Sequence, residues 1–295
     1  MRWKRVSGRG DLEDRRGQGG GPFGGGGAFP IPIGKGGGGL GLILLLVLFL
    51  VFGGNVVGGG GSGGPYSPDI DEPAPQAQPG GRPDAGAAGK DDTFEFAKFV
   101  AKDAQDVWTQ IFQQSGRQYA RAPVVIFTSG TVSGCGPASS ATGPFYCPAD
   151  RRVYLDLSFF QELSRRFGAP GDFAAAYVIA HELGHHVQSV LGIEADVRRQ
   201  QQEDPANRNL YSVRLELQAD CFSGIWARST YDRGILEPGD IDEGLTAAAA
   251  VGDDRLGAGS REQWTHGSSE LRVQWFRKGF DSGKPDDCDT SDVDL

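Results

Sequence analysis

Two histidines and a glutamate form the most chemically distinctive group in this sequence. His181 and His185 are four residues apart, and Glu182 directly follows the first of them. On a helix, residues i and i+4 lie on one face with Cβ atoms about 6 Å apart, so both imidazoles can bind one metal ion. Glu182 would lie at the flank of that face, where it can reach a metal-bound water without being a ligand. The spacing therefore predicts an H-E-x-x-H zinc site with Glu182 as general base.

The sequence around this motif has to supply a helix and a third ligand, because the alternative is a chance match of the spacing. An N-cap at Asp172, an Ala-rich stretch and a stop at Gly192 predict a helix with the motif in its middle. A second helix is predicted over residues 209–233, where Glu216 and Asp220 share a face. Glu216 would complete a His₂Glu site and leave the fourth zinc position to water. Asp220 would accept the second ring N–H of a ligating histidine. The alternative for both acids is a solvated helix face.

The remaining two of the four histidines receive different interpretations. His266 lies in a loop before the helical pattern of residues 268–280. From there it could donate a hydrogen bond to the oxyanion that develops in a transition state, and we predict this catalytic role for it. The alternative is that His266 caps the helix or bonds within its loop. His186 points about 100° away from His185 on the helix, so it is predicted to be structural.

The four cysteines predict disulfides rather than a second metal site. Cys135, Cys147, Cys221 and Cys288 form no C-x-x-C pair, and an even number in an exported domain favours disulfide bonds. Of the three possible connectivities, we expect Cys135–Cys147, which closes a Gly/Pro-rich loop, and Cys221–Cys288, which ties the C-terminal tail to the second helix. The alternative is free buried thiols. A net charge of −9 argues against nucleic-acid binding.

The N-terminal third of the chain predicts a membrane anchor. Residues 1–35 carry seven Lys/Arg against three Asp/Glu and are rich in glycine, which predicts a disordered basic cytoplasmic segment. Residues 36–58 lie in an uncharged window and predict a single-pass transmembrane signal anchor, with the N-terminus cytoplasmic and the rest exported. The alternatives are a cleaved signal peptide and a buried core helix. Residues 59–90, rich in Gly and Pro, predict a flexible linker.

Residues 91–295 are long enough for one domain with its own core, and their pattern predicts an α+β fold. A helix is expected over residues 93–114, strands of one small sheet over 123–128 and 151–157, and only helices after the motif-bearing helix. We expect residues 151–157 to be the edge strand along the cleft, where an extended peptide can bind by strand addition.

Taken together, these motifs resemble the family of bacterial neutral zinc metallopeptidases, which are membrane-anchored relatives of the gluzincin clan. The resemblance rests on Trp3 and on residues 13–17, 145–148, 171–174, 181–188, 216–221 and 265–270. It implies a zincin-like fold, one Zn²⁺ per chain bound by His181, His185 and Glu216, and Glu182 as general base. It also implies a peptide or protein substrate and a place at the bacterial cytoplasmic membrane, with the catalytic domain outside the cytoplasm.

The function predicted from the sequence is therefore that of a membrane-anchored zinc endopeptidase. The competing hypothesis is a non-catalytic metal-binding or scaffolding domain on the outer face of the cytoplasmic membrane. Glu182 favours the enzyme, because a purely structural zinc site needs no general base.

Overall fold

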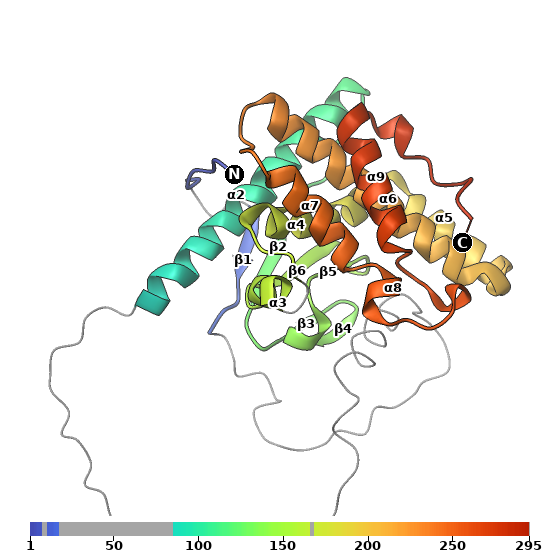
Figure 1. The fold of residues 1–295 in the computed structure, drawn as a ribbon, viewed down its shortest axis with the longest axis horizontal. Helices are drawn as coiled ribbons and strands as arrows, with labels where there is room; N and C mark the ends of the chain where they lie inside the picture. Colours follow the sequence, from blue (N-terminus) through green and yellow to red (C-terminus); the bar gives the residue numbers. More distant parts are fainter. Residues whose placement is uncertain (8–10, 18–84, 166–167, 295) are drawn as a thin grey trace, which may run out of the picture.

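A central helix with strands on one side and helices on the other organises the fold (Figure 1). The computed structural model describes residues 1–7, 11–17, 85–165 and 168–294. The helices are α2 (Ala85–Gln114), α3 (Phe159–Arg165), α4 (Asp172–Leu191), α5 (Ile193–Glu203), α6 (Arg208–Asp232), α7 (Asp240–Ala250), α8 (Asp253–Leu256) and α9 (Ser269–Ser282). Short 3₁₀ turns lie at Ser140–Thr142, Pro205–Asn207, Arg261–Gln263 and Pro285–Cys288. The predicted α+β class is confirmed.

The sheet contains both strands expected from the sequence and two that were not. Its order is β1 (Leu12–Asp14), β2 (Val124–Phe127), β6 (Arg152–Asp156) and β5 (Phe145–Cys147). The first three strands run parallel, and β5 is antiparallel to β6. The prediction that residues 151–157 form the edge strand is wrong, because β6 pairs on both sides and the edges are β1 and β5. A separate hairpin, β3 (Gly130–Ser133) and β4 (Gly136–Ser139), precedes β5.

The motif-bearing helix α4 is the centre of the hydrophobic core. All residues from Phe173 to Gly184 are buried, so the Ala-rich stretch packs on every side, against α2, α6, α7 and the sheet. The predicted stop is confirmed, since Gly192 ends the helix in the left-handed conformation at φ 84°. The N-cap is Gly171 rather than the predicted Asp172, which is the first helical residue.

Helix α9 approaches α6 more closely than ordinary side chains allow. A Cβ added to Gly279 of α9 would lie 1.9 Å from the carbonyl oxygen of Cys221, and one added to Gly224 of α6 would lie 2.1 Å from that of Phe276. Glycine at both positions therefore lets the two backbones touch. On the other side of α6, a Cβ on Gly184 of α4 would lie 3.0 Å from the carbonyl oxygen of Ala219.

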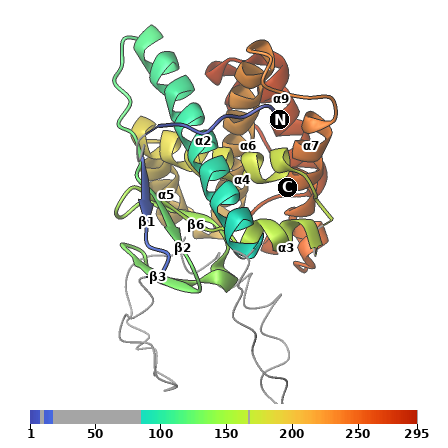
Figure 2. The same cartoon turned by 90° about the vertical axis from the view of Figure 1, so that its left-hand side faces the viewer.

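Residues 1–7 and 11–17 belong to this fold, so the predicted disorder of residues 1–35 does not hold for these two stretches, and the rest of that segment lies outside the described residues. Met1 is buried, and its amino group lies 2.8 Å from Asp172 and 3.3 Å from Asp240. The chain then crosses α2, where Trp3 packs edge-on against Phe96, and enters the sheet as β1 (Figure 2). The sequence analysis missed β1, because a strand of three residues is too short to give a periodic signal.

The pairing of β1 with β2 also bears on the predicted topology. A single crossing by residues 36–58 would place residues 1–17 and the rest of the fold on opposite sides of a membrane, which this pairing does not allow. The predicted anchor over 36–58 and most of the predicted linker over 59–90 lie outside the described residues. The linker prediction ends too late, since α2 already begins at Ala85. Within the described part of the chain, no helix has the length and hydropathy to span a membrane.

Candidate metal centre

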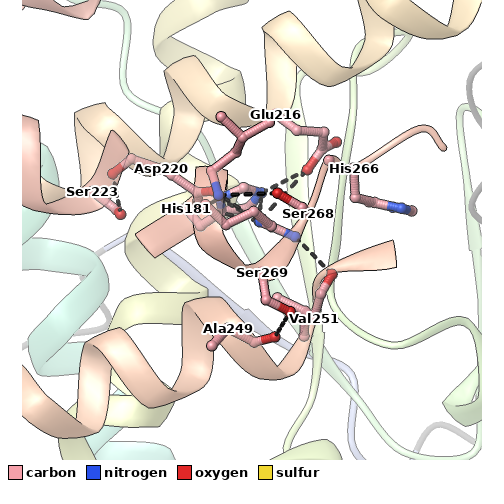
Figure 3. Close-up of polar contacts among 12 residues, drawn as sticks. His181, Glu216, Asp220, Ser223, Ala249, Val251, His266, Ser268 and Ser269 are labelled. Atoms are coloured by element: carbon pink, nitrogen blue, oxygen red, sulfur yellow. Dashed lines mark hydrogen bonds and ion pairs between the residues drawn. The ribbon is translucent and has the colours of Figure 1, made fainter. Parts of the chain in front are cut away.

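The three predicted metal ligands converge at the contact between α4 and α6, and Figure 3 shows two of them, His181 and Glu216. His181 Nε2 lies 3.2 Å from one carboxylate oxygen of Glu216, and His185 Nε2 lies 3.4 Å from the other. One ligand atom from each residue lies within 4.8 Å of the other two. Ligand atoms about 2.1 Å from a tetrahedral zinc are about 3.4 Å apart, so the donor set fits this ion.

Asp220 orients the first of these histidines. Its Oδ1 lies 2.8 Å from His181 Nδ1, and its side chain is fully buried. Because a carboxylate only accepts, the Nδ1–H is the donor to Asp220, and Nε2, which faces Glu216, is the nitrogen that can bind a metal ion once its proton has left. Tyr177 donates its hydroxyl to the same oxygen at 2.5 Å. Asp220 therefore lies where the sequence predicted, behind a ligand rather than at the metal.

Gln188 has the corresponding position behind His185, and the sequence analysis missed it. Its Oε1 lies 2.9 Å from His185 Nδ1, while its Nε2 donates to the carbonyl oxygen of Leu215 at 2.7 Å. Because the amide nitrogen of Gln188 donates to this carbonyl, Oε1 is the atom that faces His185 and accepts its Nδ1–H. The other ring nitrogen, Nε2, is then the one directed at the metal position. The i, i+3 spacing from His185 is the sequence signal that could have identified Gln188.

The histidines and carboxylates of the site stabilise one another's charged forms. Burial alone would lower the pKa of His181, but the carboxylates of Asp220 and Glu216 outweigh it and raise the pKa to about 9. Burial alone would raise the pKa of Glu216, yet His185 and His181 keep that pKa well below its usual range. Glu216 is therefore a carboxylate, as a ligand to a cation has to be.

The side chain of Glu182, on helix α4, faces the edge strand β5. It is buried, and it accepts a backbone hydrogen bond from Tyr146 of β5. Burial raises the pKa of its carboxyl group above the usual value. A carboxyl group in this position, beside both ligating histidines but outside the ligand set, has the geometry of a general base.

His266 is held by a buried aspartate that the sequence analysis did not identify. Asp253 Oδ2 accepts the backbone N–H groups of Thr265, His266 and Gly267 at 2.7–2.9 Å, and Asp253 Oδ1 lies 3.1 Å from His266 Nδ1. His266 lies beside Glu216, with its ring turned away from His181 in the view of Figure 3. The loop is thus rigid at the position from which a donor could act, and His266 is outside the ligand set.

His186 is a structural residue, in agreement with the sequence prediction. Its Nε2 lies 2.6 Å from the carbonyl oxygen of Ala120 and its Nδ1 lies 3.2 Å from the hydroxyl of Tyr146. Burial lowers its pKa, which favours the neutral ring. His186 thereby links α4 to β5 on the side away from the metal ligands.

All four cysteines are paired as predicted. Cys135 bonds to Cys147, which attaches the β3–β4 hairpin to the end of β5, and Cys221 bonds to Cys288. The second disulfide joins the C-terminal tail to α6 at the residue after Asp220. Both bonds therefore brace elements that line the candidate site.

Comparison with known proteins agrees with this site. The chain is 48% identical over 207 residues to "Uncharacterized protein YpfJ" of Escherichia coli strain K12, covering 68% of this chain and 72% of the relative. It is 47% identical over 188 residues to "Uncharacterized protein Rv2575" of Mycobacterium tuberculosis strain H37Rv, covering 58% and 63%. No solved structure matches the chain. A family model described as "Putative neutral zinc metallopeptidase" matches residues 1–291, a range that contains every ligand, orienting residue and disulfide above, and the chain belongs to that family.

Proposed function

We propose that this protein is a zinc-dependent endopeptidase with one Zn²⁺ bound by His181, His185 and Glu216. The observation that carries the proposal is the convergence of these three candidate ligands with Glu182, a buried carboxyl group outside the ligand set. A gluzincin-like assignment follows from the third ligand, since it is a glutamate from a later helix. The alternative is a non-catalytic metal-binding domain, in which Glu182 would have no chemical task.

Each residue around the zinc position has a separate role in peptide hydrolysis. A bound zinc ion supplies Lewis-acid polarisation of the scissile carbonyl and lowers the pKa of water toward 7. Glu182 accepts the proton of the attacking water and passes it to the leaving amine. His266, in its protonated form, has an Nε2–H that can donate to the developing oxyanion while Asp253 holds Nδ1. Asp220 and Gln188 keep both ligating rings in the required tautomer.

The substrate chain would bind along β5 rather than along β6. β5 is an edge strand that packs against α4, and the Tyr146 N–H already faces Glu182. In a strand, the N–H and C=O of one residue point to the same side, so the carbonyl of Tyr146 also faces the cleft. It can accept an N–H from an extended peptide or protein substrate next to the catalytic glutamate.

For the location of the protein, we propose the bacterial cytoplasmic membrane, with the peptidase domain outside the cytoplasm and residues 36–58 as an anchor whose two ends face the same side, because the pairing of β1 with β2 does not allow a single crossing. Two disulfides support an oxidising compartment, and the uncharged window supports the membrane segment. Residues 1–17 lie on the same side as the domain, since β1 belongs to its sheet.

The test uses the full-length protein, purified in detergent, with measurements of bound zinc and of cleavage of a quenched fluorescent peptide library. We expect one zinc per chain and cleavage in the wild type, loss of zinc in His185→Ala and Glu216→Ala, and retained zinc without cleavage in Glu182→Gln. Wild-type cleavage by Glu182→Gln would refute the mechanism. Zinc binding by a wild type that cleaves nothing in the library or in unfolded proteins would favour the non-catalytic alternative.

A further inference from the structure

A buried arginine lies directly behind the metal ligands without being one of them. Arg272 of α9 is 3% exposed. Its Nε donates to Asp220 Oδ2 at 2.8 Å and its Nη2 to Asp220 Oδ1 at 3.0 Å, while Nη1 donates to the carbonyl oxygen of Val251 at 3.1 Å. A buried cation next to a site for a dication is electrostatically costly, so its presence needs a reason.

The contacts of Arg272 extend to the ring of His181. Its Nη2 lies 3.4 Å from His181 Nδ1 and 3.5 Å from Nε2. These two distances place the guanidinium against the His181 ring. The Tyr177 hydroxyl donates to Asp220 and accepts from the same Nη2 at 3.2 Å. The guanidinium therefore contacts both the carboxylate that holds His181 Nδ1 and the ring itself.

We propose that Arg272 is a positioning residue for the zinc site: it fixes Asp220, and through Asp220 the ring of His181, in the orientation that metal binding requires. This inference rests on the zinc site of the proposed function and assigns no chemical step to Arg272. Fully buried Asp220 could otherwise rotate toward Tyr177 alone, which would release the Nδ1–H of His181.

The geometry requires arginine and not merely a positive charge. Two N–H groups of the planar guanidinium meet the two carboxylate oxygens of Asp220. Lysine offers a single point donor on a flexible stem and cannot reproduce this pair of contacts. The close approach of α6 and α9 at their glycines brings Arg272 within reach of Asp220.

The experiment measures the zinc dissociation constant of the full-length protein by competition with a chelator. Arg272→Lys is expected to fold and to bind zinc about 10- to 100-fold more weakly, the usual effect of losing a group that orients a ligand. The control is Arg277→Lys, an exposed arginine on the same helix, which should bind zinc as the wild type does. Wild-type zinc affinity in a folded Arg272→Lys overturns the proposal, while the proposed function fails separately if the wild type binds no zinc.

A double-mutant cycle keeps the test informative if Arg272→Lys does not fold. Arg272→Gln, Asp220→Asn and the double variant remove one or both members of the ion pair, and the double variant leaves no buried charge unpaired. If Arg272 acts through Asp220, adding Arg272→Gln to Asp220→Asn weakens zinc binding by less than about twofold. A further loss of about 10-fold or more in the double variant would show that Arg272 acts independently of Asp220, which contradicts the proposal.

Discussion

Adding one methyl group at Gly279 is the most direct perturbation of the geometry behind the metal site. The new Cβ would lie 1.9 Å from the carbonyl oxygen of Cys221, whereas an ordinary carbon–oxygen contact is about 3.3 Å. Helices α6 and α9 would have to separate by more than about 1 Å to relieve this contact. The 2.8 Å bond from Arg272 to Asp220 would then stretch to about 4 Å, beyond hydrogen-bonding distance.

The expected cost follows from these two effects. Overpacking of a core costs about 1–3 kcal/mol, and breaking a buried ion pair costs about 3–5 kcal/mol, so Gly279→Ala should destabilise the protein by about 4–8 kcal/mol. For a domain of this size, that corresponds to a fall in Tm of about 8–32 °C, measured by thermal unfolding of the zinc-free protein. Weaker zinc binding should accompany it.

The sign of the change makes this prediction decisive. In a helix with free space, Gly→Ala is stabilising by about 1 kcal/mol, because alanine has the higher helix propensity. The matched control is Gln274→Ala on the exposed face of α9, which should leave Tm within about 2 °C of the wild type. A Gly279→Ala variant that is as stable as the wild type, or more stable, would refute the reasoning about the contact between α6 and α9.

The remaining predictions concern the ligands, the pH dependence and the topology. Gln188→Leu should weaken zinc binding about 10- to 100-fold in chelator competition, because His185 loses the acceptor for its Nδ1–H; unchanged affinity would mean that Gln188 does not orient the ring. In the zinc-free protein, the pKa of His181 is raised from 6.5 to about 9, so its protonated form stabilises the fold fully below pH 6.5 and this contribution is lost as pH rises through about 9. Zinc should therefore release protons on binding at pH 7, measured by calorimetry in two buffers of different ionisation enthalpy, and an absence of proton release would contradict the assignment. His266→Ala should retain zinc and fold but lose roughly 10²-fold or more in turnover, with little change in KM; near wild-type turnover would make the loop purely structural. A membrane-impermeant thiol reagent should label Ser7→Cys on intact cells to the same extent as Ser291→Cys, and selective protection of the first would refute the shared side.

The convergence of the three candidate ligands could be predicted from the sequence because their signal is local. The i, i+4 spacing of His181 and His185 on a helix, and of Glu216 and Asp220 on another, depends only on helical geometry. The pairing of the cysteines was also predictable, since only three connectivities exist for four.

Residues that act across long sequence separations were not predictable in this way. Arg272 lies 52 positions from Asp220, and Asp253 lies 13 positions before His266. Nothing in the pattern of α9 distinguishes a buried arginine from a solvated one, because the glycines that bring α9 onto α6 are visible only in the packed structure. The position of β6 in the sheet was misjudged for the same reason: strand order depends on β1 and β5, which are three residues each and give no periodic signal.

The charges of the N-terminal segment bear on the topology that the sequence predicts for it. The positive-inside rule treats Arg15 and Arg16 as free cations that stay in the cytoplasm. In the fold, Arg15 pairs with Glu13 and Arg16 with Asp14, both at 2.7–2.8 Å, so these charges are largely compensated inside the strand segment itself. Arg152 of β6 also pairs with Glu13, which attaches the segment to the sheet. The family model spans this segment together with the candidate metal ligands, and the pairing of β1 with β2 joins Leu12–Asp14 to the same fold.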